Sequence, residues 1–161
     1  MEIERKYLVK SLPTDLGQYP HVEIEQGYLC TSPTLRIRRM GDFFILTIKE
    51  NLRTDSSAIH NREEEFALSA ESYCRLREKC EGIMVSKSRY RIPLEHGLMA
   101  ELDIFNGVHK GLMLVEVEFP DTEKADGFIP PAWFGEDVSC DPRYRNSYLA
   151  HSPADRNTES I

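Results

Sequence analysis

Pairs of charged residues two positions apart recur along this chain and are its feature most able to do chemistry. The first segment, Glu2-Ile3-Glu4-Arg5-Lys6, places three charged side chains at alternate positions. On a β-strand, residues two apart point to the same face, so like charges would stand about 6.6 Å apart and repel by about 2.5 kcal/mol at an effective dielectric near 20. The same spacing returns in Arg36/Arg38, Glu63/Glu65, Lys87/Arg89, Glu101/Asp103 and Glu116/Glu118, and in Thr47/Lys49, where one member is polar and uncharged.

One Glu-x-Glu or Arg-x-Arg pair is usually a solvated sheet face. Six or seven pairs in one short chain instead favour a face that binds a highly charged ligand. On that face the carboxylates outnumber the cations eight to six, a surplus that suits Mg²⁺ or Mn²⁺. The arginines suit phosphate oxygens, and metal with cations is the usual equipment for phosphoryl transfer.

The residues allow a division of labour in such a reaction. One carboxylate could orient the attacking water, while Lys87 or Lys6 could neutralise the leaving phosphate. Spacing does not say which carboxylate orients the water. For the acidic run 62–65 we choose the register that turns Glu63 and Glu65 to the charged face, because Phe66 and Leu68 then share the apolar face.

Short alternating segments must position these pairs. They predict eight strands, separated by turn signals such as Gly41-Asp42 and Asn106-Gly107. Short connections suggest an antiparallel meander that closes into a barrel, with charged residues inside and apolar residues outside. The predicted fold is mainly β (α+β), a closed eight-stranded antiparallel β-barrel tunnel with peripheral α-helices. The strands are expected at 2–10, 22–31, 34–40, 43–50, 59–68, 85–93, 98–106 and 112–119.

Three segments are predicted to be helical. The segment 69–82 has apolar residues at helical spacing, with Ser69 as the start and Gly82 as the end, and we expect it to pack outside the barrel. The others are 121–128 and 141–150, the latter opened by Asp141-Pro142. We expect a mobile loop at 51–57, a single domain over 1–150 and a disordered tail over 151–161.

Composition limits the partners. The net charge of −7 argues against nucleic acid, and no apolar run approaches the ~20 residues of a membrane span. The chain starts in the charged pattern without a signal peptide, so we expect a cytoplasmic protein. Four cysteines without CxxC spacing indicate reduced, structural thiols. An apolar outer strand face would allow a homodimer.

The ordered set of motifs resembles the CYTH superfamily, the triphosphate tunnel metalloenzymes. The resemblance begins with Glu2-x-Glu4-x-Lys6 and runs to about residue 150, where Asp141-Pro142-Arg143-Tyr144-Arg145-Asn146 resembles the C-terminal part of short bacterial members. The stations between are Leu35-Arg36-Ile37-Arg38, Leu46-Thr47-Ile48-Lys49, Glu63-x-Glu65, Lys87-Ser88-Arg89-Tyr90, Glu101-Leu102-Asp103 and Leu114-Val115-Glu116-Val117-Glu118-Phe119.

The resemblance implies a metal-dependent phosphohydrolase that cleaves inorganic tripolyphosphate to pyrophosphate and phosphate, using Mg²⁺ or Mn²⁺. It implies metal ligands at Glu2, Glu4, Glu116 and Glu118, with Asp103 on the metal side. It implies phosphate contacts from Lys6, Arg36, Arg38, Lys49, Lys87 and Arg89. Catalytic roles are expected for Lys87, Glu63 and Glu65.

Two alternatives stay open from the sequence. The same tunnel could act on an organic triphosphate, hydrolysing thiamine triphosphate or converting ATP to cyclic AMP, although no aromatic cluster at a tunnel mouth is evident. It could also bind polyphosphate without turnover. The carboxylate surplus counts against pure anion binding, because a plain anion receptor does not need so many negative charges.

Overall fold

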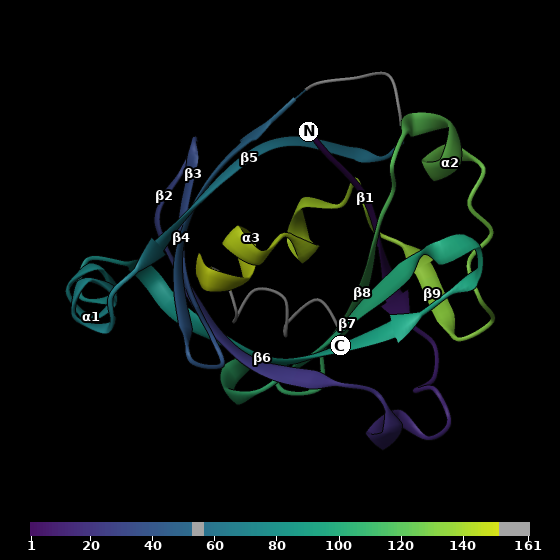
Figure 1. Cartoon of the computed structure of the whole chain (residues 1–161), viewed down its shortest axis with the longest axis horizontal. Coiled ribbons are helices and arrows are strands. Elements are labelled where there is room, and N and C mark those ends of the chain that lie inside the picture. Colours follow the sequence, from purple (N-terminus) through teal and green to yellow (C-terminus); the bar gives the residue numbers. More distant parts are fainter. Residues whose placement is uncertain (53–56, 152–161) are drawn as a thin grey trace.

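A closed antiparallel barrel dominates the structure, a computed structural model that describes residues 1–52 and 57–151 (Figure 1). The eight predicted strands are all present, and a ninth, short strand follows them. Their bounds are β1 Glu2–Val9, β2 His21–Thr31, β3 Thr34–Met40, β4 Phe43–Asn51, β5 Ile59–Leu68, β6 Glu81–Pro93, β7 Met99–Phe105, β8 Met113–Glu118 and β9 Phe134–Asp137.

The strand order differs from one continuous meander. It runs β5-β4-β3-β2-β6-β7-β8-β1, and β1 closes the ring by pairing with β5. Two meanders, β2 to β5 and β6 to β8, therefore join through β2 and β6, and β1 fills the gap between them. The expectation of a single meander was wrong because the connections 10–20 and 69–80 are long enough to carry the chain between strands that are not neighbours.

The barrel is closed by a short stretch of strand pairing. β1 pairs with β5 only through Glu2↔Asn61, Ile3↔His60 and Glu4↔Ile59. Further along, the same edge of β1 pairs with β9, at Tyr7↔Asp137 and Val9↔Phe134. The unpredicted β9 thus covers the part of the β1 edge that β5 leaves free, which removes an exposed strand edge.

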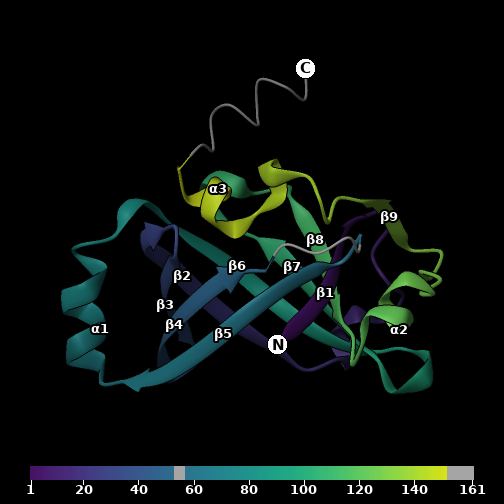
Figure 2. The same ribbon diagram turned by 90° about the horizontal axis from the view of Figure 1, so that it is seen from above.

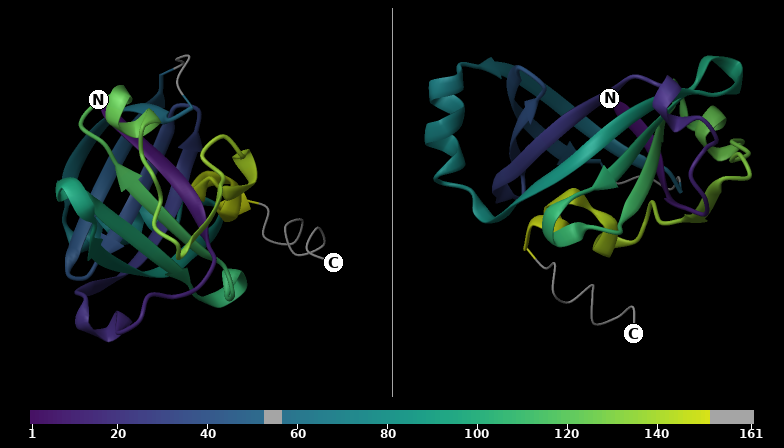
Figure 3. Two further views of the ribbon diagram at one scale, coloured as in Figure 1. Left: turned by 90° about the vertical axis from the view of Figure 1, so that its right-hand side faces the viewer. Right: turned by 90° about the horizontal axis from the view of Figure 1, so that it is seen from below.

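Helix α1 (Ala70–Arg77) packs outside the barrel, as expected, and Ser69 is its N-cap, whose Oγ accepts a hydrogen bond from the Ser72 backbone N–H. It ends before Gly82, because β6 already begins at Glu81. Figure 3 (right) shows α1 and α2 (Thr122–Asp126) at opposite sides of the barrel. None of the described helices is long and apolar enough to cross a membrane.

The third predicted helix is divided. Residues Pro142–Tyr144 form a 3₁₀ turn, Arg145 is extended, and α3 spans Asn146–His151. The tail expected over 151–161 is described only at His151, which belongs to α3, and its other residues, 152–161, lie outside the described residues. The loop expected over 51–57 is also only partly described: Asn51 belongs to β4, and 53–56 lie outside the description.

Apolar residues are buried on both faces of the barrel wall. The outward residues Leu102, Val115 and Val117 are fully buried in a cluster with Phe119 and Phe134, which confirms the apolar outer face. A second cluster places Leu149 and Ala150 of α3 against inward residues of the strands, among them Val85, Phe105 and Leu114. Figures 1 and 2 show α3 lying across one end of the barrel. The tunnel is consequently covered at that end.

Candidate active site

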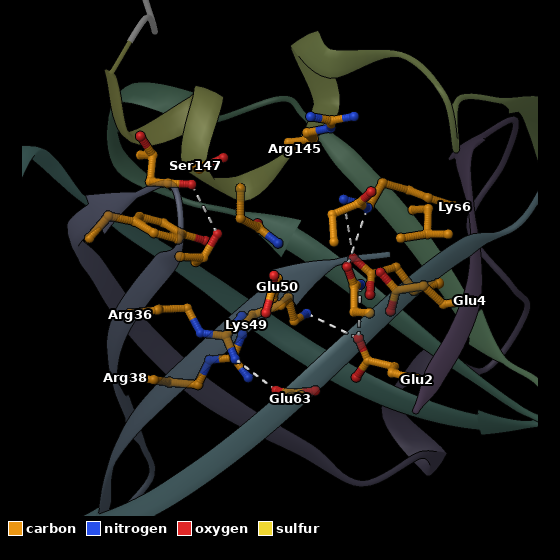
Figure 4. A pocket seen from close by; sticks show the side chains of 18 of the residues that line it. Glu2, Glu4, Lys6, Arg36, Arg38, Lys49, Glu50, Glu63, Arg145 and Ser147 are labelled. Atoms are coloured by element: carbon orange, nitrogen blue, oxygen red, sulfur yellow. Dashed lines mark hydrogen bonds and ion pairs between the residues drawn. The ribbon is translucent and has the colours of Figure 1, made fainter. Parts of the chain in front are cut away.

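The barrel encloses a polar cavity of about 830 Å³ (Figure 4). Its wall includes most of the residues singled out from the sequence, and both Glu63 and Glu65 line it, in agreement with the register chosen for β5. Lys87 and Asp103 are absent from the wall. The predicted residues that line the cavity are Glu2, Glu4, Lys6, Arg36, Arg38, Lys49, Glu63, Glu65, Arg89, Glu101, Glu116 and Glu118.

Strand pairing brings the two ends of the sequence together at this site. On β1 and β8, Glu4 lies opposite Glu118 and Lys6 lies opposite Glu116. Glu116 in turn lies opposite Glu101 of β7. Because side chains alternate along each strand, these residues share the inner face. The acidic side of the cavity is therefore built by strands that are far apart in sequence.

Three cations of the wall each contact one carboxylate. Lys6 Nζ lies 3.3 Å from Glu116 Oε1, and Lys49 Nζ lies 3.1 Å from Glu2 Oε1. Arg36 Nη2 lies 3.5 Å from Glu63 Oε1 and donates to Thr47 Oγ1 at 3.3 Å. The first pair joins the neighbouring strands β1 and β8, whereas the other two each reach past one intervening strand. The pairs neutralise charge inside the barrel, which lets the fold tolerate so many buried ionic groups.

Asp103, which does not line the cavity, joins Lys87 to Arg89. Arg89 donates from Nε and Nη2 to the two Asp103 oxygens at 2.8 and 2.9 Å, and Lys87 Nζ lies 2.7 Å from Oδ2. Lys87 is completely buried and also donates to Asn146 Oδ1 at 3.3 Å. Both oxygens of Asp103 are therefore engaged by cations, and only Arg89 of this group reaches the cavity.

The carboxyl groups of the site differ in proton affinity. Burial, reinforced by the charge of Glu116, raises the pKa of Glu4 to about 8. Burial and a hydrogen bond with Glu2 raise the pKa of Glu63 to about 7. Burial acts in the same direction on Glu116, but the charges of Lys6 and Arg89 outweigh it and hold its pKa well below the usual value. The site thus contains a carboxyl with a pKa near neutral pH, that of Glu63, and a carboxylate that stays ionised, that of Glu116.

A hard divalent cation fits the acidic side of the cavity. Within 1–52 and 57–151 no three His, Cys, Asp or Glu side chains form a ready cluster for a metal ion. Glu4, however, is a carboxyl without an ion pair to any described residue, and Glu116 and Glu118 lie beside it. Mg²⁺ commonly takes one or two carboxylates and completes its shell with waters and substrate phosphates, so the oxygen donors present are suitable.

Several wall residues were not predicted from the sequence. Arg145, Asn146 and Ser147 enter the cavity from the C-terminal segment, and Figure 4 shows Arg145 there. Tyr28 lines the wall, and Gln26 contacts Arg38 from the same face of β2. The inward parity of β2 could have identified Gln26 and Tyr28, but neither is charged. Arg145 follows no strand pattern, so only the fold reveals it.

The fold and the site define a β-barrel tunnel of the CYTH type, with cations and carboxylates facing a common cavity. The chain is 41% identical over 155 residues to an inorganic triphosphatase of Nitrosomonas europaea, a match that covers 94% of this chain and 97% of the relative. It is 34% identical to an inorganic triphosphatase of Acetivibrio thermocellus over 160 residues, covering 94% of each. The chain belongs to the bacterial inorganic triphosphatase family.

Solved structures agree with this placement. The crystal structure of the inorganic triphosphatase NE1496 superposes with a TM-score of 0.69 at 39% identity, covering 94% of this chain and 95% of that one. The putative adenylyl cyclase HpAC1 from Hippeastrum, at 18% identity and a TM-score of 0.59 over 79% of this chain and 83% of that one, shares the fold. No family model matches the chain.

Proposed function

We propose that this protein hydrolyses inorganic tripolyphosphate to pyrophosphate and phosphate. The observation that carries the proposal is the cavity itself, where cations suited to phosphate oxygens face a group of carboxylates inside a closed barrel. Two relatives named inorganic triphosphatase, each covering 94% of the chain, support the same reaction.

The character of the wall favours an inorganic substrate over an organic one. Among the described residues, Tyr28 is the aromatic side chain of the cavity wall, and Met40 and Ile59 are its larger aliphatic ones. A nucleobase or thiazole ring would find little surface on which to stack. Thiamine triphosphate and ATP are therefore less favoured, and the cyclase-named neighbour supports the fold alone.

Substrate binding is assigned to the strand cations that reach the cavity, with Arg145 of the C-terminal segment as a further contact. The strand cations are Lys6, Arg36, Arg38, Lys49 and Arg89. Their carboxylate contacts of 3.1 to 3.5 Å at Lys49, Lys6 and Arg36 are single and can be exchanged for phosphate oxygens. A planar guanidinium binds two phosphate oxygens at once, whereas a lysine acts as a point charge. The chain of phosphates would thus lie along the basic wall.

Glu2, Glu4, Glu116 and Glu118 would hold Mg²⁺ or Mn²⁺. The support is the chemistry of their oxygens and the Glu4 carboxyl, which has no ion pair within 1–52 and 57–151. When bound, the ion supplies positive charge against the phosphate oxygens and so favours attack on phosphorus. Occupation of the site would also favour the ionised form of Glu4, because a cation opposes the effect of burial.

Glu63 is proposed to orient the attacking water and accept its proton. Its pKa of about 7 matches the requirement for a general base near neutral pH. The water oxygen bonds to the terminal phosphorus, the bridging P–O bond breaks, and pyrophosphate leaves with the bond's electron pair. Glu65, which lies on the same strand and also lines the cavity, would assist by orienting the water.

For Lys87 and Asp103 we propose positioning roles in place of direct substrate and metal contacts. Asp103 holds Arg89 with two hydrogen bonds, and Lys87, which does not line the cavity, neutralises Asp103. This arrangement fixes the guanidinium plane of Arg89 before phosphate binds, which lowers the entropy lost on binding.

The decisive experiment measures phosphate release from tripolyphosphate, thiamine triphosphate and ATP, with Mg²⁺, Mn²⁺ or EDTA. We expect fastest turnover of tripolyphosphate, and none with EDTA. Glu4→Gln and Glu63→Gln should each lose activity by about 100-fold or more, while Glu64→Gln, on the exposed face of β5, should match wild type. Cyclic AMP from ATP without tripolyphosphate turnover, or equal rates in all variants, would overturn the proposal.

We also propose a cytoplasmic location and a homodimer, both of which the sequence led us to expect. Exposed apolar side chains such as Phe43 and Phe66 support self-association. Light scattering should then give twice the chain mass of 18.6 kDa, and a monomer at micromolar concentration would refute the dimer.

A further inference from the structure

Arg38 differs from the other five cations predicted for the site in the charge of the group that it contacts. The side chains of Lys6, Arg36, Lys49, Lys87 and Arg89 each contact at least one carboxylate. Arg38 instead donates from both Nε and Nη2 to the amide oxygen of Gln26, at 2.9 and 2.8 Å. No carboxylate of the described residues lies within ion-pair distance of it. The positive charge of Arg38 is therefore held in place without being cancelled.

The fold makes this contact a fixed one. Gln26 on β2 and Arg38 on β3 lie directly opposite each other in the antiparallel ladder. Gln26 is completely buried and Arg38 is 8% exposed, with its side chain on the cavity wall. The nitrogen of the same Gln26 amide, Nε2, has no hydrogen-bond partner among the described residues. The side chain thus leaves a buried donor unsatisfied while its oxygen holds the guanidinium.

The surroundings of Arg38 make the binding of an anion beside it more favourable. Arg36 lies two residues away on the same face of β3, and Arg89 contributes a further positive charge nearby; burial and these two cations lower the pKa of Arg38. A cation that is buried, close to like charges and not neutralised is relieved most by a polyanion. A glutamate at the position of Gln26 would accept the same two hydrogen bonds, but its negative charge would neutralise Arg38 and so weaken the attraction of Arg38 for a polyanion.

We propose that Gln26 is a positioning residue for phosphate binding: it fixes the Arg38 guanidinium through a neutral acceptor, so that Arg38 provides the principal uncompensated charge for a substrate phosphate. This inference rests on the proposed function. The proposed role of Gln26 could not be found from the pattern of charges in the sequence, because Gln26 is itself neutral.

The test compares Gln26→Glu with wild type. Binding of tripolyphosphate without metal is followed by calorimetry, and hydrolysis is followed with Mg²⁺. We expect the Kd and the KM to rise about 10- to 100-fold, with a smaller change in kcat. The melting temperature should stay level or rise, because the introduced carboxylate pairs with Arg38. A purely structural role for Gln26 predicts no such separation of stability from binding.

Three further variants keep the inference falsifiable. Gln26→Met removes the acceptor at similar volume, and should weaken binding less than Gln26→Glu. Gln26→Glu should add little in an Arg38→Gln background, and Gln18→Glu, exposed on the 3₁₀ turn Leu16–Gln18, should bind as wild type. An unchanged Kd in Gln26→Glu, or an equal loss with and without Arg38, would overturn the inference. Wild type that neither binds nor cleaves tripolyphosphate would instead refute the proposed function.

Discussion

Lys6 and Glu116 lie directly opposite each other on β1 and β8, with Lys6 Nζ 3.3 Å from Glu116 Oε1. Lys6 Nζ also donates to the backbone carbonyl of Tyr144 at 2.9 Å. One lysine therefore connects the first strand, the last strand of the barrel and the C-terminal segment. The site is assembled only when all three are in place, so its chemistry depends on complete folding.

Removal of the Glu116 charge should abolish turnover without unfolding the barrel. In Glu116→Gln, Lys6 loses its carboxylate partner and the acidic side loses a proposed metal ligand. We expect kcat/KM to fall by about 100-fold or more and the Mg²⁺ concentration for half activity to rise. Assays across a magnesium series, with circular dichroism as the folding check, measure both; full activity at ordinary magnesium would contradict the assignment.

Arg145 should contribute to substrate affinity more than to the chemical step. It reaches the cavity from the C-terminal segment and is exposed, so solvent screens its charge. Arg145→Ala should raise the KM for tripolyphosphate about fivefold to tenfold with little change in kcat. Arg143→Ala is the matched control, since Arg143 pairs with Asp141 at 2.8 Å and does not line the cavity; the same KM in both variants would count against Arg145.

Gly82 should be required for docking of α3. Its φ is +65°, and a Cβ there would overlap the Ala150 carbonyl oxygen. Gly82→Ala should therefore cost more than about 2 kcal/mol of unfolding free energy or release α3 to proteolysis. Gly97→Ala provides the comparison, because Gly97 has φ +71° with nothing within 4 Å of the added Cβ. Equal losses in the two variants would mean that backbone strain alone is responsible.

Asp103 should stabilise the protein in a pH-dependent manner. Burial would raise its pKa, but the charges of Arg89 and Lys87 outweigh burial and lower it. A carboxyl with a lowered folded-state pKa stabilises the fold above its unfolded pKa of about 3.9, and this stabilisation is lost as pH falls further. Asp103→Asn should lose about 3–5 kcal/mol at pH 7. In urea unfolding, the gap from wild type should narrow below about pH 4; a constant gap would contradict the linkage.

The alternation of residue types was enough to predict the inner face of the barrel. Charged residues at every second position identify inward side chains because successive side chains of a strand point to opposite faces, and the eight strands lie where this pattern placed them. The pattern also set the register of Glu63 and Glu65, since a slip by one residue would have turned Phe66 into the cavity. Strand β9 escaped prediction because four residues carry too little periodicity.

The sequence by itself determined which side chains face inward and that they suit a polyphosphate and a hard cation. Tertiary structure alone decided which inward residues reach the cavity. Lys87 and Asp103 obey the same alternation as Arg89, yet α3 and the apolar end of the barrel bury them. Likewise, Gln26 acquires its role from the strand that lies opposite. The physical reason is that alternation is local, whereas burial and cross-strand partners depend on contacts between residues distant in sequence.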